Sequence, residues 1–306
     1  MDKMLQEIME IPQRATEFWA SPAKLVLPLN VPYLGMGSSY FAPLAFKLMG
    51  IPIQPEIASE FYNYQTNACR FPNGVILSQS GRSSEALWCA QLFEQYIGIS
   101  NYTQNALCTA PNVAGFIDLM ASDEQYSSSK TYINTLLSLF KGLGFDAADS
   151  IALLEKKMPQ YAEKGEEMAN QVFELITIGK IHGIYIVGSG PNNATAYEAS
   201  LILSESTKLC FTGLPMAQYD HGPKETAANS IVIQILAKGK SYERAQKLTK
   251  VIEASGAHVL AVEEPETEEN FSVIHNIVPF NFMAYYLAQK LNVGETFVVG
   301  GKVTEV

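Results

Sequence analysis

The sequence predicts an α/β protein with two doubly wound parallel sheets, and three observations favour this class. Short apolar runs alternate with segments of helical periodicity, which is the pattern of βαβ units. Two of the runs end in a Gly-x-Gly turn, at Gly35–Gly37 and at Gly188–Gly190. The turn segments 81–85 and 239–243 follow at similar offsets, so the chain reads as an internal repeat of one fold.

Composition sets limits on the class of protein. The chain has 306 residues, which is enough for two domains that each bury a core. With 47% hydrophobic and 17% charged residues it should be compact and soluble. A formal net charge of -10 argues against a general nucleic-acid partner. No apolar run approaches the roughly 20 residues that span a membrane, and the acidic start is unlike a signal peptide, so we expect a cytoplasmic protein.

Four segments are expected along the chain. Residues 1–30 form an N-terminal helical arm that Pro12 interrupts, and residues 31–145 form the first domain. Residues 146–180 form a helical connector, and residues 181–306 form the second domain with a C-terminal tail. Strands are predicted at the apolar runs 32–35, 51–57, 75–77, 106–109, 116–120, 183–188 and 230–236. Helices are predicted at 41–48, 86–93, 130–143, 149–179 and 193–208, with another that opens at 237–243.

The stretch from Pro72 to Leu87 organises the first domain. An apolar strand, a tight turn with four serines and a glutamine, and a helix follow one another. Glycine lets the turn approach a ligand closely, and a helix start attracts anions. The hydroxyls and the amide add donors, so the turn is predicted to bind a phosphate monoester. The alternative is a serine-rich turn that only caps the helix.

Metals and cofactors are not expected. The four histidines lack metal-ligand spacing, and the four cysteines are interpreted as reduced core thiols, Cys69, Cys89, Cys108 and Cys210. A dinucleotide site is weakly supported, because Tyr40 and Asn193 stand where the third glycine of the fingerprint belongs.

Several motifs resemble the sugar isomerase (SIS) family, in the tandem form found in the isomerase half of glucosamine-6-phosphate synthase. These motifs are Glu56–Phe61, Leu77–Gly81, His221–Pro223, and Glu7-Ile8 with Pro12. The resemblance covers nearly the whole chain. It implies two flavodoxin-like SIS domains related by a repeat, and a homodimer whose active sites lie at the subunit interface.

The resemblance also implies site residues. Phosphate donors would be Ser39, Ser78, Gln79, Ser80 and Ser83, in agreement with the turn described above. Ser38 and Ser128 would contact sugar hydroxyls. Glu205 would move a proton between C1 and C2, His221 would open the sugar ring from a loop that reaches the neighbouring subunit, and Lys302 would act from the C-terminal tail.

The proposed acid–base chemistry is reasonable for these residue types. A carboxylate or imidazole can move a proton beside a carbonyl. Glu205 lies in an apolar helical segment, where burial would raise its pKa. The alternatives are a solvated carboxylate on the helix for Glu205 and an ordinary surface histidine for His221.

Departures from the family pattern favour one reaction. Ile202 replaces a lysine one helical turn before Glu205, where it should line the same pocket. That loss resembles the deglycases that split fructose-amino-acid 6-phosphates, and Arg82 could meet the amino acid's carboxylate. The alternatives are a glucosamine-6-phosphate deaminase or ammonia-dependent synthase, an aldose/ketose phosphate isomerase, and a phosphosugar-sensing module without turnover.

Overall fold

The computed structural model describes residues 2–23, 25–65 and 70–303, and they form two compact units. The five-strand unit comprises residues 10–151 and 297–306, and the four-strand unit comprises residues 1–9 and 152–296. Within the described residues, no helix is both long enough and apolar enough to span a membrane.

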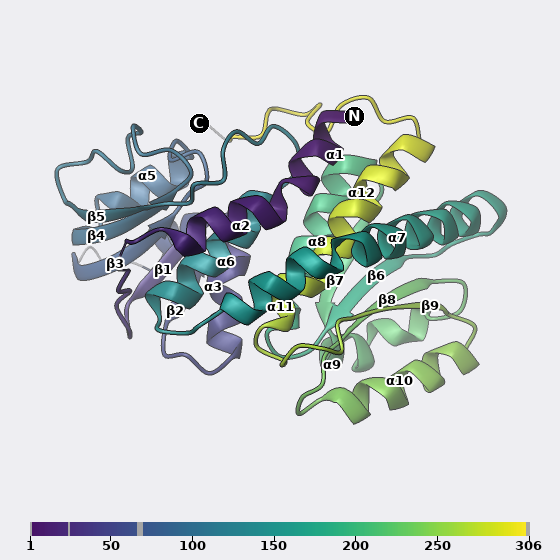
Figure 1. The fold of residues 1–306 in the computed structure, drawn as a ribbon. Coiled ribbons are helices and arrows are strands. Elements are labelled where there is room, and N and C mark those ends of the chain that lie inside the picture. Colours follow the sequence, from purple (N-terminus) through teal and green to yellow (C-terminus); the bar gives the residue numbers. More distant parts are fainter. Residues whose placement is uncertain (1, 24, 66–69, 304–306) are drawn as a thin grey trace. The chain divides into compact units, whose positions relative to one another are not determined.

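All strands of the five-strand unit are parallel, and their order is β2-β1-β3-β4-β5 (Figure 1). This is the doubly wound order in which β1 and β3 flank the switch point. The strands are β1 (Pro32–Gly35), β2 (Gln54–Ile57), β3 (Phe71–Leu77), β4 (Phe93–Ser100) and β5 (Val113–Asp118). The helices are α2 (Ile11–Ala20), α3 (Ser38–Leu48), α4 (Ala58–Glu60), α5 (Ser84–Ala90) and α6 (Lys130–Gly142), with a π-helical turn at Phe61–Gln65.

The four-strand unit holds a second parallel sheet in the order β7-β6-β8-β9 (Figure 1). Its strands are β6 (Ile184–Gly188), β7 (Phe211–Pro215), β8 (Ile231–Leu236) and β9 (His258–Glu263). Its helices are α1 (Asp2–Met9), most of α7 (Ala148–Ile178), α8 (Asn192–Thr207), α9 (Met216–Asp220), α10 (Tyr242–Ala254), α11 (Ser272–Asn276) and α12 (Val278–Lys290), with a 3-10 turn at Pro223–Thr226.

The central strands β1, β6 and β8 are buried along almost their whole length, as expected where both faces of a sheet are covered. In the five-strand unit, Leu34 and Ile76 pack in one buried cluster with Cys89 of α5. Tyr33 and Val75 alternate with them, point to the other face and are also fully buried. Central strands with two covered faces position their carboxyl ends rigidly.

The predicted alternation of strands and helices is confirmed, with local errors. The helical arm breaks after Met9, and Pro12 lies in the first turn of α2, as expected. The prediction of a strand at 106–109 is wrong, because those residues form turns. Strands β4, β7 and β9 were missed, and the helix predicted at 86–93 ends at Ala90 because Phe93 already starts β4.

The compact units differ from the sequence-based segments at both chain ends. Residues 2–9 were expected to belong with the rest of the N-terminal arm, but they cluster with the four-strand unit. Residues 297–303 were expected in the second domain, but they cluster with the five-strand unit. The predicted connector corresponds to α7, a single helix of 31 residues.

Candidate functional site

The serine-rich turn, residues 78–84, lies where the doubly wound fold places ligands. We call this segment the cradle. It begins directly after β3 and leads into α5. The turn Gly35–Gly37 ends the neighbouring strand β1 and leads into α3, which starts at Ser38 and Ser39. The two turns therefore stand at adjacent carboxyl ends beside the switch point, which is the ligand position of such sheets.

The cradle is shaped by hydrogen bonds among its own groups. The backbone N–H of Gly81 donates to Ser78 Oγ at 3.1 Å, and that of Arg82 donates to Ser80 Oγ at 3.2 Å. Ser78 Oγ in turn donates to Ser83 Oγ at 3.4 Å. A hydroxyl that accepts from an amide still has its own proton to donate. The cradle thus gathers several hydroxyls around one tight turn.

Gly81 is required at the centre of the cradle. Its φ of +65° is in the left-handed region, which disfavours side chains. A Cβ there would also stand 2.1 Å from the side chain of Asn105. Asn105 is fixed in turn, since its Nδ2 donates to Ser100 Oγ and its Oδ1 accepts from the N–H of Cys108. The segment after β4 therefore packs closely against the cradle.

The predicted sugar-contacting residue Ser128 lies in the segment between β5 and α6, residues 119–129, which we call the sugar loop. Ser128 Oγ is 3.0 Å from Thr131 Oγ1 and is half-buried. Asn101 connects this loop to the cradle. Its backbone N–H donates to Gln79 O at 3.0 Å, and its side-chain Oδ1 accepts from the N–H of Ala121 at 2.9 Å.

Lys302, which was predicted to be catalytic, is fixed against the same loop. Its Nζ donates to the carbonyl oxygens of Glu124 and Tyr126, at 2.8 and 2.5 Å, and to Glu124 Oε2 at 3.3 Å. Cradle, sugar loop and Lys302 all belong to the five-strand unit. Eight of the ten residues predicted for the site thus belong to the five-strand unit, namely Ser38, Ser39, Ser78, Gln79, Ser80, Ser83, Ser128 and Lys302.

The other two predicted residues, Glu205 and His221, belong to the four-strand unit. Glu205 lies half-buried in the last turn of α8. His221 is exposed at the C-terminal end of α9. Lys224 and Arg244 each donate to the neighbouring Asp220 at 3.0 Å and hold the pKa of that carboxyl below its usual value. This ion cluster anchors the backbone just before His221.

The expectation that Ile202 lines a pocket with Glu205 is wrong for the isolated chain. Ile202 has no exposed surface, whereas Glu205 is only half-buried. Residues three positions apart lie on one side of α8. On that side Ile202 faces the core, and Glu205 lies nearer to solvent. Ile202 is therefore a core residue.

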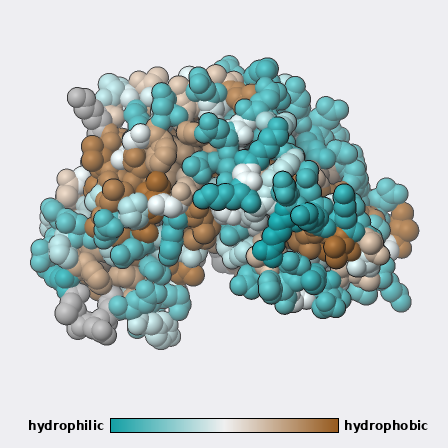
Figure 2. Space-filling model, turned by 90° about the horizontal axis from the view of Figure 1, so that it is seen from below, coloured by the Kyte–Doolittle hydropathy of each residue, from teal (hydrophilic) through white to brown (hydrophobic). Residues whose placement is uncertain are grey.

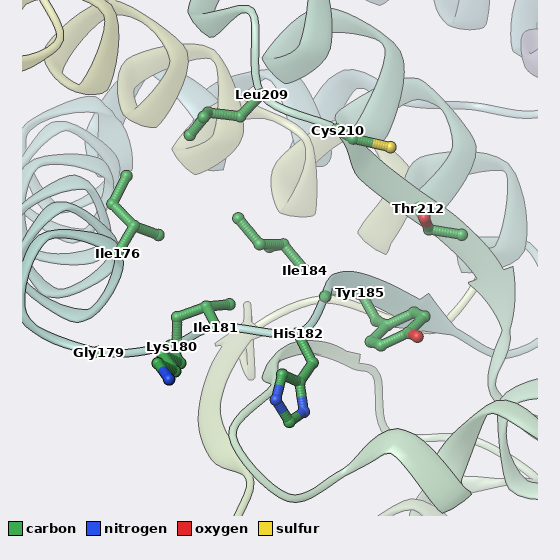
Figure 3. Close-up of a pocket in the computed structure, with 11 residues that line it drawn as sticks. Ile176, Gly179, Lys180, Ile181, His182, Ile184, Tyr185, Leu209, Cys210 and Thr212 are labelled. Carbon is green, nitrogen blue, oxygen red and sulfur yellow. The ribbon is translucent and has the colours of Figure 1, made fainter.

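Two cavities of the four-strand unit lie at the amino ends of its strands. One of 590 Å³ is lined by residues at the amino ends of β6 and β7, among them His182, Ile184 and Cys210 (Figure 3). One of 270 Å³ lies next to it, with Lys180 and His258 in its wall. Neither contains a predicted site residue. Both are at the edge of the sheet opposite to the carboxyl ends.

The cysteine interpretation holds in part. Cys89 and Cys108 are buried, and burial raises the pKa of the Cys89 thiol to about 12, as expected of inert core thiols. Cys210 is exposed, so its assignment to the core was wrong. It directly precedes β7, outside the apolar interior of the strand. Cys69 lies outside the described residues.

Sequence reasoning missed three residues that shape the site, Asn101, Asn105 and Glu124. Asn101 carries no local pattern, since its partners Ser122 and Gln79 are about twenty residues away along the chain. Asn105 bonds to its neighbours Ser100 and Cys108, in a turn segment that the sequence did not distinguish. Glu124 carried no local signal either, since it stands five residues before the cap position Ser129, outside the positions that capping patterns use.

Solved structures with the same fold define the class. Glucosamine-6-phosphate deaminase from Thermotoga maritima matches with a TM-score of 0.77 and 17% identity, over 96% of each chain. The C-terminal domain of glucosamine-fructose-6-phosphate aminotransferase from Francisella tularensis matches with a TM-score of 0.75 and 17% identity, over 95% of this chain and 97% of that one. Tagatose-6-phosphate ketose/aldose isomerase from Escherichia coli reaches 0.72 at 14% identity, over 96% and 94%. The chain has the fold of the phosphosugar isomerases.

Sequence comparison agrees with the fold. Glutamine–fructose-6-phosphate aminotransferase 1 of Arabidopsis thaliana is 24% identical over 301 residues, which cover 84% of this chain and 44% of the relative. The Pyrobaculum aerophilum enzyme is 25% identical, over 93% of this chain and 54% of its own length. The chain spans about half the length of the curated relatives it matches. No family model matches. The predicted resemblance to the SIS proteins, and to the isomerase half of the synthase in particular, is confirmed.

Proposed function

We propose that this chain is a phosphosugar-processing enzyme that cleaves fructose-amino-acid 6-phosphates to glucose 6-phosphate and an amino acid. The observation that carries the proposal is the cradle, a turn whose backbone amides hold several hydroxyls together beside the switch point of a parallel sheet. Charge-assisted hydrogen bonds from such donors suit a phosphate dianion. In a chain of net charge -10, local donors of this kind must provide the attraction.

The five-strand unit alone is proposed to hold the phosphate. The two units would be copies of one ancestral fold, since their sheets have the same strand order. The order β2-β1-β3-β4 in the first sheet corresponds to β7-β6-β8-β9 in the second. In the second copy Leu236-Ala237-Lys238 stands where the first has Ser78-Gln79-Ser80. A Cβ on Gly239 would stand 2.1 Å from the carboxyl carbon of Glu269, so a carboxylate already lies against that turn. Its negative charge would repel a phosphate.

The proposed reaction begins with opening of the sugar ring by His221, which exposes the C2 ketone. Glu205 removes a proton from C1 to give an enaminol and returns a proton to C2, so that the double bond moves to C1 and nitrogen. Water then adds to C1 of this imine. The C1–N bond breaks, the amine leaves with a proton from His221, and the aldehyde of glucose 6-phosphate remains. General acid–base steps of this kind each contribute about 10²- to 10⁴-fold in rate.

Ile202 favours deglycation over amination or deamination. The lysine that relatives carry one helical turn before the carboxylate is absent here, because position 202 is a fully buried isoleucine. Without that lysine, ammonia chemistry at C1 and C2 would lose a proton donor. The main alternative is a deaminase or isomerase, which the names of the structural relatives favour.

The active unit is proposed to be a homodimer in the cytoplasm, where phosphorylated sugars are retained. His221 is exposed, which suits a histidine that completes the site of a neighbouring subunit. Apolar side chains also gather on the underside of the five-strand unit, in brown in Figure 2. Exposed apolar residues of this unit include Val26, Leu29 and Tyr64, at 79%, 49% and 79% exposure. A second copy would remove such surface from water.

The reaction is tested by incubating the purified protein separately with fructoselysine 6-phosphate, glucosamine 6-phosphate and fructose 6-phosphate. The proposal predicts release of lysine and glucose 6-phosphate from the first compound, without ammonia from the second. Ammonia release would assign a deaminase, and conversion of fructose 6-phosphate to an aldose phosphate would assign an isomerase. Binding without any product would assign a sensing module.

A further inference from the structure

Glu124 is a buried carboxylate that organises the end of the sugar loop. Its side chain has no exposed surface. It accepts hydrogen bonds from the N–H of Ser129 at 3.0 Å, from Ser129 Oγ at 2.9 Å and from the N–H of Thr131 at 3.2 Å, and also from Thr131 Oγ1. These are groups at the start of α6, whose amides lack helical partners. The carboxylate therefore caps α6 and fixes the backbone on both sides of Ser128.

Lys302 supplies the remaining partner of this carboxylate from the far end of the chain. An ammonium has three protons, and each has an acceptor here: Glu124 O, Tyr126 O and Glu124 Oε2. The Lys302 side chain is 21% exposed, so the pair is largely shielded from water. An ammonium bound in this way holds two turns of the loop together.

The other end of the sugar loop is tied to the cradle. Asn101 Nδ2 donates to Ser122 O at 2.5 Å, and Asn101 Oδ1 accepts from the N–H of Ala121. The backbone N–H of Asn101 and the hydroxyl of Ser100 both donate to Gln79 O. Hydrogen bonds thus tie the start of the sugar loop to the cradle and its later part to the tail lysine.

We propose that Lys302 and Glu124 form a latch through which the docked C-terminal tail holds Ser128 in position for the sugar. Lys302 is then a positioning residue, and it takes no part in proton transfer. The assignment of Ser128 to the sugar rests on the proposed function, whereas the latch itself rests on the contacts of Glu124 and Lys302.

Hydrogen–deuterium exchange tests the latch without any substrate. The test compares wild type with Lys302→Met, Lys302→Arg and the matched control Lys47→Met, which removes an exposed lysine of the same unit. The latch predicts that amides in residues 124–131 exchange at least about tenfold faster in Lys302→Met, because local opening becomes easier. Arginine can still donate to both carbonyls and the carboxylate, so Lys302→Arg and the control should stay near wild type. Unchanged protection in Lys302→Met would overturn the latch.

Kinetics with the substrate turned over by wild type separate positioning from catalysis. Lys302→Met should raise KM by about tenfold or more, since a loose loop no longer presents Ser128, and Lys302→Arg should restore most of the loss. Glu124→Gln should lose at least as much as Lys302→Met, because it weakens the cap of α6 as well as the contact with Lys302. The double variant should lose less than the sum of the two single losses, because the variants share the Glu124–Lys302 contact. If Lys302→Arg keeps its exchange protection but is as inactive as Lys302→Met, Lys302 acts on the reacting atoms, and the claim that it only positions the loop fails. If wild type turns over no phosphosugar, the proposed function fails, and the exchange result still decides the latch.

Discussion

At the residue scale, His275 shows how burial links protonation to stability. Its side chain has no exposed surface, and burial lowers its pKa from 6.5 to about 4, with the Lys157 ammonium acting in the same direction and the Glu264 carboxylate opposing both. Tyr161 Oη donates to Glu264 Oε2 at 2.9 Å and lies 2.9 Å from His275 Nδ1. Since the tyrosine's proton is used toward Glu264, the neutral His275 must donate from Nδ1.

Acid should therefore destabilise the fold through His275. Between pH 6.5 and pH 4 the unfolded chain binds a proton at this residue and the folded chain does not, so stability falls as the pH is lowered through that window. The contribution to the free energy of unfolding is about 3 kcal/mol. Denaturant unfolding of wild type and His275→Gln at pH 7, 5 and 4 measures it. The variant should lose this part of the pH dependence, and parallel pH profiles of the two proteins would contradict the prediction.

At the element scale, the cradle turn depends on Gly81. Gly81→Ala would put a methyl group into the side chain of Asn105 at a φ of +65°, so the turn must move. We expect a loss of about 1–3 kcal/mol in the free energy of unfolding and weaker binding of inorganic phosphate. Gly144→Ala is the matched control, because it has φ +85° with nothing within 4 Å of the added Cβ. Equal effects of the two variants on phosphate binding would show that contact with Asn105 does not shape the cradle.

Elements with a strong local signal could be predicted from the sequence, and those without one could not. The cradle was predicted because a hydroxyl-rich turn follows an apolar strand, and β8 because five of its six residues are apolar. Strand β4 was not predicted, because it follows α5 after only two residues, Gln91 and Leu92. The spacing of its polar residues also resembles that of a helix. The role of Glu124 depends on Lys302, 178 residues away, which no local pattern encodes.

At the scale of the whole molecule, the account requires two subunits for one active site. If His221 serves the neighbouring subunit and Glu205 serves its own, a dimer of Glu205→Gln with His221→Asn has one intact site and one doubly altered site. Each variant alone should lose about 10²- to 10⁴-fold in kcat. Random re-assortment of equal amounts should restore roughly a quarter of wild-type activity, because half of the dimers are mixed. Activity that stays at the level of the separate variants would assign both residues to the same subunit's site.

The central claim is that the cradle binds the phosphate of a sugar phosphate. The most direct test is calorimetric titration of wild type and Ser80→Ala with fructose 6-phosphate and with fructose. The account predicts that wild type binds the phosphorylated sugar at least about 100-fold more tightly than fructose, since charged hydrogen bonds are lost without the phosphate. Ser80→Ala should weaken binding of fructose 6-phosphate by about tenfold and leave binding of fructose unchanged. Equal affinity of wild type for the two sugars would contradict the account.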